Sequence, residues 1–236
     1  MLIDAGAALA EGAAAAARAR AAAAIGITRQ LIAGCDGPAP VSDFGITSLN
    51  RRRRVLARGR AGEVDWCAAA DARRPDHARD QIARASQRGA VAVDLFTAGA
   101  DELAQDMAVV EASRRGLPIR LADAALAAEL ARAHPRAAFV CSAPGDALPA
   151  DAAMDALAAR PNVHLDLATC GAVRGAIDAA LQRFGPDRLL WGTAARLDVA
   201  LAQLRALDVI APGEGVLDNI RWRNALRLYK RLGGEG

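Results

Sequence analysis

Residues 116–142, GLPIRLADAALAAELARAHPRAAFVCS, contain one complete alternation of strand, helix and strand. Short apolar segments at 118–121 and 138–142 predict buried strands, and the longer segment 124–134 between them has the pattern of a helix. Gly116 ends the helix that precedes this unit, and Pro118 opens the strand. The stretch therefore predicts a strand-then-helix unit that leads directly into the next strand.

The same alternation runs from one end of the chain to the other. Strands are predicted at residues 2–6, 28–33, 64–70, 90–96, 118–121, 138–142, 163–168 and 189–192. Helices are predicted at residues 9–24, 49–57, 76–87, 100–115, 124–134, 150–159, 171–184 and 198–207. Eight such units without a break in composition predict an α/β fold, a single (β/α)8 TIM barrel spanning residues 1–232. Residues 219–232 are expected to form an extra C-terminal helix, and residues 233–236 a frayed tail.

Composition and charge exclude several classes of protein. The 236 residues are 53% hydrophobic and 24% charged, which is enough apolar material for a sizeable core and argues against disorder. A net charge of +3 is too mild to indicate a nucleic-acid partner. The arginine run at 51–54 is expected to be a solvated helix face, with an anion or partner contact as the other interpretation.

Cysteine usage and hydropathy predict the cellular setting. The four cysteines show no CxxC spacing and do not suggest a disulfide scaffold. The alanine-rich stretch at 7–24 has no basic start and is interrupted by charges, so it is expected to be an amphipathic helix and not a signal peptide. No apolar run reaches membrane-spanning length, so we expect a cytoplasmic protein without a membrane partner.

Five segments, in order along the chain, resemble the metal-dependent amidohydrolases. MLIDAGAA (1–8) resembles the "I-D-x-H-x-H" opening strand of that family, and GLPIRLAD (116–123) and RAAFVCSAPGD (136–146) resemble its fifth and sixth strands. DRLLWGTAAR (187–196) is similar to the "d-R-i-l-f-G-S-D" strand, and NALRLYKRL (224–232) to the "N-a-x-r-L-f" closing helix. The resemblance covers essentially the whole chain and is to the branch with small aromatic-acid decarboxylases and lactonases.

The positions that hold the metal in that family are small and apolar in this chain. They are Gly6, Ala8, Ala122, Ala143 and Ala194. Metal hydrolysis in this fold needs imidazole and carboxylate ligands and an aspartate to accept the proton of water, and these residues supply neither. The remaining histidines, His77, His134 and His164, have no paired spacing. We therefore expect no bound metal and no other cofactor.

If the family's register holds, alternation along the strands predicts which polar side chains enter the barrel. One interpretation of this set is a metal-free pocket in which Arg120 holds a substrate carboxylate and an aspartate–histidine pair moves protons. The interpretation that we favour is a network of buried charges, with a salt bridge from Arg120 to Asp94, Asp166 or Asp4. Neither assigns a definite catalytic residue. The candidate residues are Asp4, Asp94, Arg120, Cys141, His164 and Asp166.

The loss of the metal site predicts a degenerate barrel, a pseudoenzyme that serves as a non-catalytic or regulatory subunit. Its partner would be a second copy of itself or an active paralogue, with exposed Trp222, Leu226 or Tyr229 as interface anchors. The structural alternative is that these three side chains pack the last helix onto its own barrel. The alternative function is a metal-independent hydrolase, lactonase or decarboxylase acting on a small carboxylate. A third possibility is a sensor that binds a small ligand in the emptied pocket.

Overall fold

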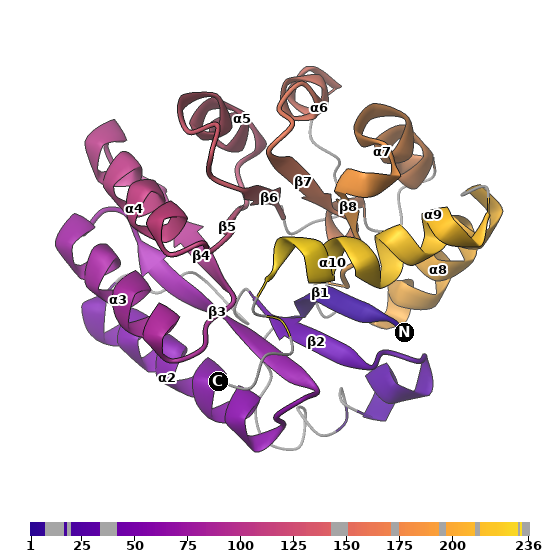
Figure 1. The fold of residues 1–236 in the computed structure, drawn as a ribbon, viewed down its shortest axis with the longest axis horizontal. Helices are drawn as coiled ribbons and strands as arrows, with labels where there is room; N and C mark the ends of the chain where they lie inside the picture. Colours follow the sequence, from indigo (N-terminus) through magenta and orange to yellow (C-terminus); the bar gives the residue numbers. More distant parts are fainter. Residues whose placement is uncertain are drawn as a thin grey trace.

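The computed structural model describes residues 1–7, 17, 20–33, 42–142, 151–170, 175–193, 197–210, 213–230 and 232. Their strands form one parallel sheet in the order β1 to β8, rolled into a nearly closed barrel (Figure 1). Beyond the paired β-ladder, Ala5 N donates a 3.0 Å hydrogen bond to Trp191 O, which joins the first strand to the end of the last. The predicted (β/α)8 fold is confirmed. The strands are β1 (Ile3–Ala7), β2 (Arg29–Ile32), β3 (Val64–Asp71), β4 (Ala92–Phe96), β5 (Ile119–Leu121), β6 (Phe139–Cys141), β7 (Val163–Asp166) and β8 (Leu189–Leu190).

The main helices surround the barrel and lie outside its strands (Figure 1). Several begin at side-chain caps, which satisfy backbone N–H groups that the first turn leaves unpaired. Ser42 Oγ accepts from Gly45 N at 3.0 Å, so the second helix begins at Asp43, six residues before its predicted start at residue 49. Within the described residues, no helix is both long and apolar enough to cross a membrane. The helices are α2 (Asp43–Gly59), α3 (Pro75–Gln87), α4 (Glu102–Arg114), α5 (Ala124–Ala133), α6 (Asp151–Ala158), α7 (Ala176–Phe184) and α8 (Leu197–Ile210).

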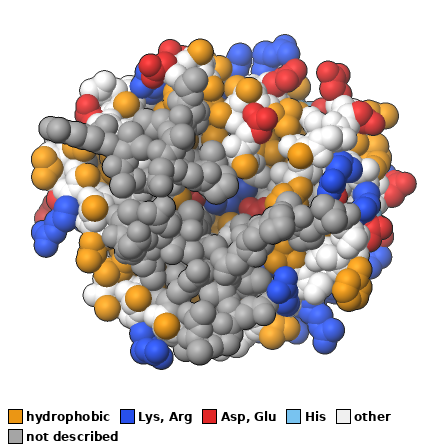
Figure 2. Space-filling model, turned by 180° about the vertical axis from the view of Figure 1, so that it is seen from behind, with side chains coloured by type: hydrophobic (Ala, Val, Ile, Leu, Met, Phe, Trp, Pro, Cys, Tyr) orange, Lys and Arg blue, Asp and Glu red, His pale blue; other side chains and the backbone are white. Residues whose placement is uncertain are grey.

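The C-terminal segment closes one end of the barrel. It consists of α9 (Glu214–Asp218), a π-helical turn at Asn219–Arg223 and α10 (Asn224–Leu228), and α10 crosses the barrel in Figure 1. Asn224 Nδ2 donates to Pro186 O and Leu189 O, both at 2.7 Å, which fixes α10 at the beginning of β8. The closed end is therefore the N-terminal end of the strands, and Figure 2 views the opposite, C-terminal end.

Tyr229, one residue beyond α10, is fully buried among apolar side chains of the barrel interior. The rest of this inner cluster comes from strands on all sides of the barrel, including Ile3, Leu31 and Leu190. Trp222 and Leu226 pack against the same cluster and are half-buried. These side chains therefore hold the terminal segment on its own barrel, and the expectation of an exposed interface anchor is wrong for Tyr229.

Side chains of α2 replace a neighbouring strand along the second half of β3. The pairing of β2 with β3 ends at Ile32 and Trp66. Beyond that point, Arg53 Nη1 donates to Cys67 O at 2.8 Å, and the Asn50 amide donates to Ala69 O at 2.9 Å and accepts from Ala69 N at 2.6 Å. Buried backbone groups need hydrogen-bond partners, and here a helix supplies them. The helix thereby brings the charge of Arg53 to the barrel.

Candidate functional site in the barrel

Arg120 enters the barrel from the middle of β5. Its neighbours Ile119 and Leu121 pack into the outer core between sheet and helices, so alternation turns Arg120 to the inner side. Arg120 is in register with Asp94 of β4 and with Val140 of β6, and Val140 belongs to the inner cluster. The predicted inward orientation of Arg120 and Asp94 thus agrees with the strand register.

The guanidinium of Arg120 is 4% exposed and has partners on every side. Nη2 donates to Asp166 Oδ2 at 2.9 Å and to Ser142 Oγ at 2.7 Å. Nη1 donates to Ala5 O at 2.8 Å and to the Tyr229 hydroxyl at 2.9 Å. Nε lies 3.3 Å from Asp94 Oδ1. The predicted buried salt bridge is confirmed, with Asp94 and Asp166 as its acids.

These contacts keep Arg120 charged. Burial alone disfavours a charged group, but Tyr229 and Asp166, followed by further neighbouring groups, raise the pKa of Arg120 well above its usual value. Burial, which also disfavours a charged phenolate, raises the pKa of the Tyr229 hydroxyl. The phenol therefore remains a neutral hydrogen-bond acceptor for the arginine at neutral pH.

A second arginine, Arg53, completes the charge balance of the centre. Its side chain is fully buried and its Nη2 lies 2.8 Å from Asp94 Oδ2. The expectation that residues 51–54 form a solvated face is therefore wrong at Arg53, because this side chain turns inward to the open edge of β3. The two arginines and the carboxylates of Asp94 and Asp166 carry equal and opposite charge, which is the condition for keeping them out of water.

Asp166 is the last residue of β7, and both of its carboxylate oxygens accept hydrogen bonds. Oδ2 accepts from Ser142 Oγ at 3.0 Å in addition to Arg120, and Oδ1 accepts from Ala168 N at 2.9 Å. Gly192 follows β8, the strand that pairs with β7, and it leaves room for the Asp166 carboxylate. A Cβ at residue 192 would lie only 2.2 Å from Asp166 Oδ1. Ser142 is the half-buried member of this group, just beyond the C-terminal end of β6.

Figure 2 shows charged side chains in a hollow at the centre of this face of the barrel. We call Arg53, Asp94, Arg120, Ser142, Asp166 and Tyr229 the charged centre.

Three of these residues were missed by reasoning from the sequence. Ser142 lies two residues after Val140, which faces the barrel interior. Assigning the even-numbered residues of β6 to the inner side would therefore have identified Ser142. Arg53 and Tyr229 carry no such signal, because each reaches the centre from a helical segment and not from a strand.

The other candidate residues lie away from this centre. Cys141 and its neighbour Phe139 are in the outer core, so the predicted inward orientation of Cys141 is wrong. Asp4 is flanked by Ile3 and Ala5 of the inner cluster and instead accepts hydrogen bonds from Thr193 N at 3.0 Å and Thr193 Oγ1 at 2.7 Å. In such short strands a shift of one residue reverses every side chain.

His164 also stands apart from the charged centre, although it is in register with inward Val140. It lies two residues before Asp166, toward the end of the barrel that the C-terminal segment closes. Burial lowers the pKa of His164 to about 4, with smaller contributions from the charges of Arg188 and Arg227. At neutral pH the imidazole is therefore uncharged.

The described residues at the family's metal positions do not fit a metal. Gly6 lies in β1 and Ala122 directly after β5, and neither has a ligating atom; Ala8, Ala143 and Ala194 lie outside the described residues. Across the described ranges, no three His, Cys, Asp or Glu side chains are grouped to hold a metal ion. The Arg120 guanidinium lies 2.9 Å from Asp166. Its fixed positive charge occupies the position in which a metal cation would need that carboxylate as a ligand. A barrel mouth plugged by residues 35–44 would favour a purely structural centre, but residues 35–41 of that segment lie outside the described residues.

Comparison with known proteins agrees with this fold. The family model of the amidohydrolases matches residues 5–231. No curated protein matches the sequence significantly. Among solved structures, 2,6-dihydroxybenzoate decarboxylase from Rhizobium has a TM-score of 0.73 and 16% identity, over 97% of this chain and 98% of that one. A 5-carboxyvanillate decarboxylase from Sphingomonas paucimobilis has a TM-score of 0.67 and 12% identity, over 97% and 98%. A dihydroxybenzoic acid decarboxylase from Polaromonas sp. JS666, with bound manganese and an inhibitor, has a TM-score of 0.71 and 13% identity, over 91% and 85%.

Proposed function

From the premise that this chain belongs to the amidohydrolase family, we propose that it acts on a small carboxylic acid without a metal ion, as a decarboxylase or a hydrolase. The charged centre is its site. The structural relatives whose names include decarboxylation of aromatic acids support this class of substrate, although at 12–16% identity the likeness itself extends only to the fold. The proposal replaces the pseudoenzyme hypothesis as the leading function.

The observation that carries the proposal is the position of Ser142 between Arg120 and Asp166. Its half-buried hydroxyl contacts both charged groups and lies at the C-terminal end of the strands, where barrel enzymes have their active sites. A substrate carboxylate that replaces the Ser142 hydroxyl on Nη2 would form a charge-assisted hydrogen bond with Arg120. This approach leaves the other Arg120 contacts in place.

The same group of residues can transfer a proton. In a decarboxylation the bond from carbon to the carboxylate breaks, CO2 leaves with its two oxygens, and the electron pair left on carbon takes up a proton. In a hydrolysis a base must instead remove a proton from water. In a hydrolysis the ionised Asp166 accepts the proton of water through the Ser142 hydroxyl. In a decarboxylation the proton that carbon takes up comes from water through the same hydroxyl, which Asp166 orients.

The test is turnover by protein treated with a chelator. A panel of hydroxybenzoates and small lactones is assayed for CO2 release and for ring opening, with wild type, Asp166→Asn and Ser142→Ala. We expect wild-type turnover in the presence of chelator and a loss of 100-fold or more in Asp166→Asn, the range that a positioned acid or base contributes. Arg132→Gln, an exposed arginine on α5, is the control and keeps full activity. Activity that appears only with added metal contradicts the proposal.

A second candidate function is a non-catalytic subunit, and the closed bonding of Arg120 favours it. An arginine has five N–H donors, and the four on Nη1 and Nη2 already have acceptors at hydrogen-bond distance. Nη1 and Nη2 of Arg120 are thus satisfied without a ligand, as in a purely structural network, while Nε lies 3.3 Å from Asp94 Oδ1. In this case the barrel would bind a second copy or an active amidohydrolase paralogue.

Arg120→Ala separates the two candidates. Removal of one partner from a buried charge pair costs about 3–5 kcal/mol of stability, because the remaining carboxylate stays buried and unpaired. If Arg120 is purely structural, the variant melts at a much lower temperature and there is no acid binding to lose. If the melting temperature is unchanged and binding of a benzoate is abolished, Arg120 serves a ligand. Size measurement at micromolar concentration, alone and with a co-purifying amidohydrolase, then tests the subunit role directly.

A further inference from the structure

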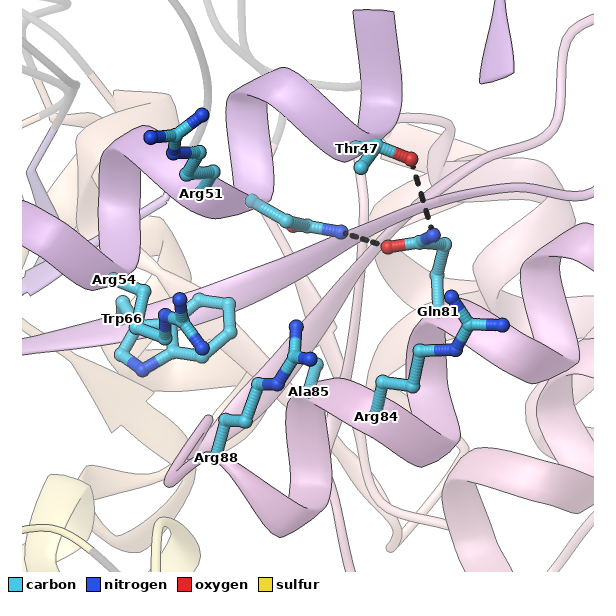
Figure 3. A pocket seen from close by; sticks show the side chains of 9 residues that line it. Thr47, Arg51, Arg54, Trp66, Gln81, Arg84, Ala85 and Arg88 are labelled. Atoms are coloured by element: carbon cyan, nitrogen blue, oxygen red, sulfur yellow. Dashed lines mark hydrogen bonds between the residues drawn. The ribbon is translucent and has the colours of Figure 1, made fainter. Parts of the chain in front are cut away.

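We propose that a second site, on the outer surface between α2 and α3, binds a small phosphate-bearing anion. The site is a cavity of about 140 Å³, roughly ten times the space that one buried water needs. Four of its lining residues are arginines: Arg51 and Arg54 from α2, and Arg84 and Arg88 from α3 and its C-terminal cap (Figure 3). We call it the α2–α3 pocket. It lies outside the barrel and is separate from the charged centre.

The arginines of this pocket are poorly neutralised. None of the nine described residues that line it is acidic. Of the four, only Arg84 has an ion pair with a carboxylate in the described part of the chain, a 2.9 Å contact to Asp80 that is more than half exposed. Exposed pairs of this kind contribute little. Arg51, Arg54 and Arg88 thus line one pocket and have no carboxylate partner in the described part of the chain.

This arrangement opposes the stability of the two helices. Like charges spaced as Arg84 and Arg88, and as Arg54 and Arg58, disfavour a helix. Burial, and then the charges of Arg88, Arg58 and Arg51, lower the pKa of Arg54, which means that the groups repel one another. A bound anion would remove this repulsion, and that is the physical reason for assigning the pocket to one.

The remaining lining residues give the pocket a fixed wall. Gln81 accepts from Asn50 Nδ2 at 3.1 Å and donates to Thr47 Oγ1 at 3.2 Å (Figure 3), and its Nε2 also lies 3.2 Å from His77 Nε2. Trp66, only 4% exposed, supplies an apolar surface beneath. Arg51, Arg84 and Arg88 are exposed and Arg54 is half-buried, so these side chains line the pocket on its solvent side.

A phosphate group fits this set better than a lone carboxylate. It carries about two negative charges and several acceptor oxygens, and arginine binds it with two parallel hydrogen bonds. Arginines from two helices can therefore share one phosphate or diphosphate. A nucleic acid would need a longer basic stripe than one concave pocket, and the chain's net charge of +3 offers no wider field for it.

The experiment is calorimetric titration of the whole protein with inorganic phosphate, pyrophosphate and phenyl phosphate at constant ionic strength, with chloride as the reference. The variant is Arg54→Gln combined with Arg88→Gln, and the control is Arg132→Gln, which removes an exposed arginine from α5. We expect the double variant to bind at least tenfold more weakly and the control to bind as wild type. Tighter binding of phenyl phosphate than of the inorganic anions identifies a phosphorylated metabolite as the ligand, and the reverse order identifies the free ion.

Thermal melting gives an independent readout. Without ligand, the double variant melts at or above the wild-type temperature because repulsion is relieved, so a failure to bind is not a failure to fold. With pyrophosphate, wild type and Arg132→Gln gain stability and the double variant does not. Equal binding by wild type and double variant, no binding of any of the three anions, or tight salt-dependent binding of a nucleic acid instead, overturns the proposal.

Discussion

At the scale of single residues, the charged centre depends on the absence of a side chain at Gly192, next to Asp166. Gly192 has no side chain, and the Asp166 carboxylate lies close to its Cα. A Cβ built on Gly192 would be only 2.2 Å from Asp166 Oδ1. A carboxylate in contact with both Arg120 and Ser142 cannot move away without losing one of them. The glycine of the WGT sequence is therefore a positioning residue for the acid.

The first prediction follows from this close approach. Gly192→Ala should lower the free energy of unfolding by about 1–3 kcal/mol, the usual cost of overpacking, and should lower any turnover as Asp166 shifts. Gly59→Ala is the control, because a Cβ there meets nothing within 4 Å and alanine favours the end of α2. Urea denaturation of both variants measures the difference, and an unchanged midpoint for Gly192→Ala would show that Asp166 is not held as described.

A second prediction concerns His164. Its pKa in the folded protein is about 4, below the ordinary value of 6.5, so between these pH values the unfolded chain takes up a proton that the folded chain does not. The free energy of unfolding should fall as the pH is lowered from about 6.5 to 4, by at most about 3 kcal/mol. His164→Gln should flatten this dependence, whereas His77→Gln, on α3 outside the barrel, should keep it. Chemical denaturation across this pH range checks it, and equal slopes in wild type and His164→Gln would contradict the assignment.

At the scale of elements, the contact of α2 with β3 is the unusual feature. A neighbouring parallel strand would ordinarily bond to Cys67 and Ala69, but side chains of one helix do so here. The arrangement binds a helix to the sheet through directed hydrogen bonds as well as through apolar packing. It also carries Arg53 to Asp94, so the same helix has one side at the charged centre and another at the α2–α3 pocket.

The third prediction tests this substitution of a helix for a strand. Asn50→Ala leaves the backbone N–H and C=O of Ala69 buried without their present partner, and each such group costs about 1–3 kcal/mol. We expect a clear loss of stability and faster hydrogen exchange at the Ala69 amide. Ser48→Ala, on the same helix and half-buried, should change neither. Native-state exchange followed by magnetic resonance measures the effect, and continued protection of Ala69 in Asn50→Ala would contradict it.

At the scale of the whole molecule, the barrel is closed at one end and charged within. The C-terminal segment covers the N-terminal ends of the strands, and Tyr229 reaches from it to Arg120. The opposite, C-terminal end of the strands is the face seen in Figure 2. The chain has the amidohydrolase barrel, and inside it the Arg120 guanidinium lies between the carboxylates of Asp94 and Asp166.

The fourth prediction is that the purified protein holds no stoichiometric zinc, manganese or iron. The described metal positions lack ligating atoms, and the fixed charge of Arg120 repels a cation from Asp94 and Asp166. Elemental analysis after incubation with each metal and desalting should find much less than one ion per chain. Chelator should leave the melting temperature unchanged. One tightly bound metal in every chain, inside the barrel, would contradict the prediction.

Much of this molecule follows from the sequence alone, because it depends on local periodicity. Alternating apolar strands and helices predict eight units, and alternation places Asp94, Arg120 and Asp166 inside, where opposite charges must meet. What the tertiary structure decided are the features that depend on contacts far apart in the chain. Arg120 meets Ala5 and Tyr229 across 115 and 109 residues, and no local pattern reveals either contact. The side of the sheet that Cys141 faces was settled by the register of a three-residue strand, and the burial of Arg53 by an edge of β3 that needed hydrogen-bond partners.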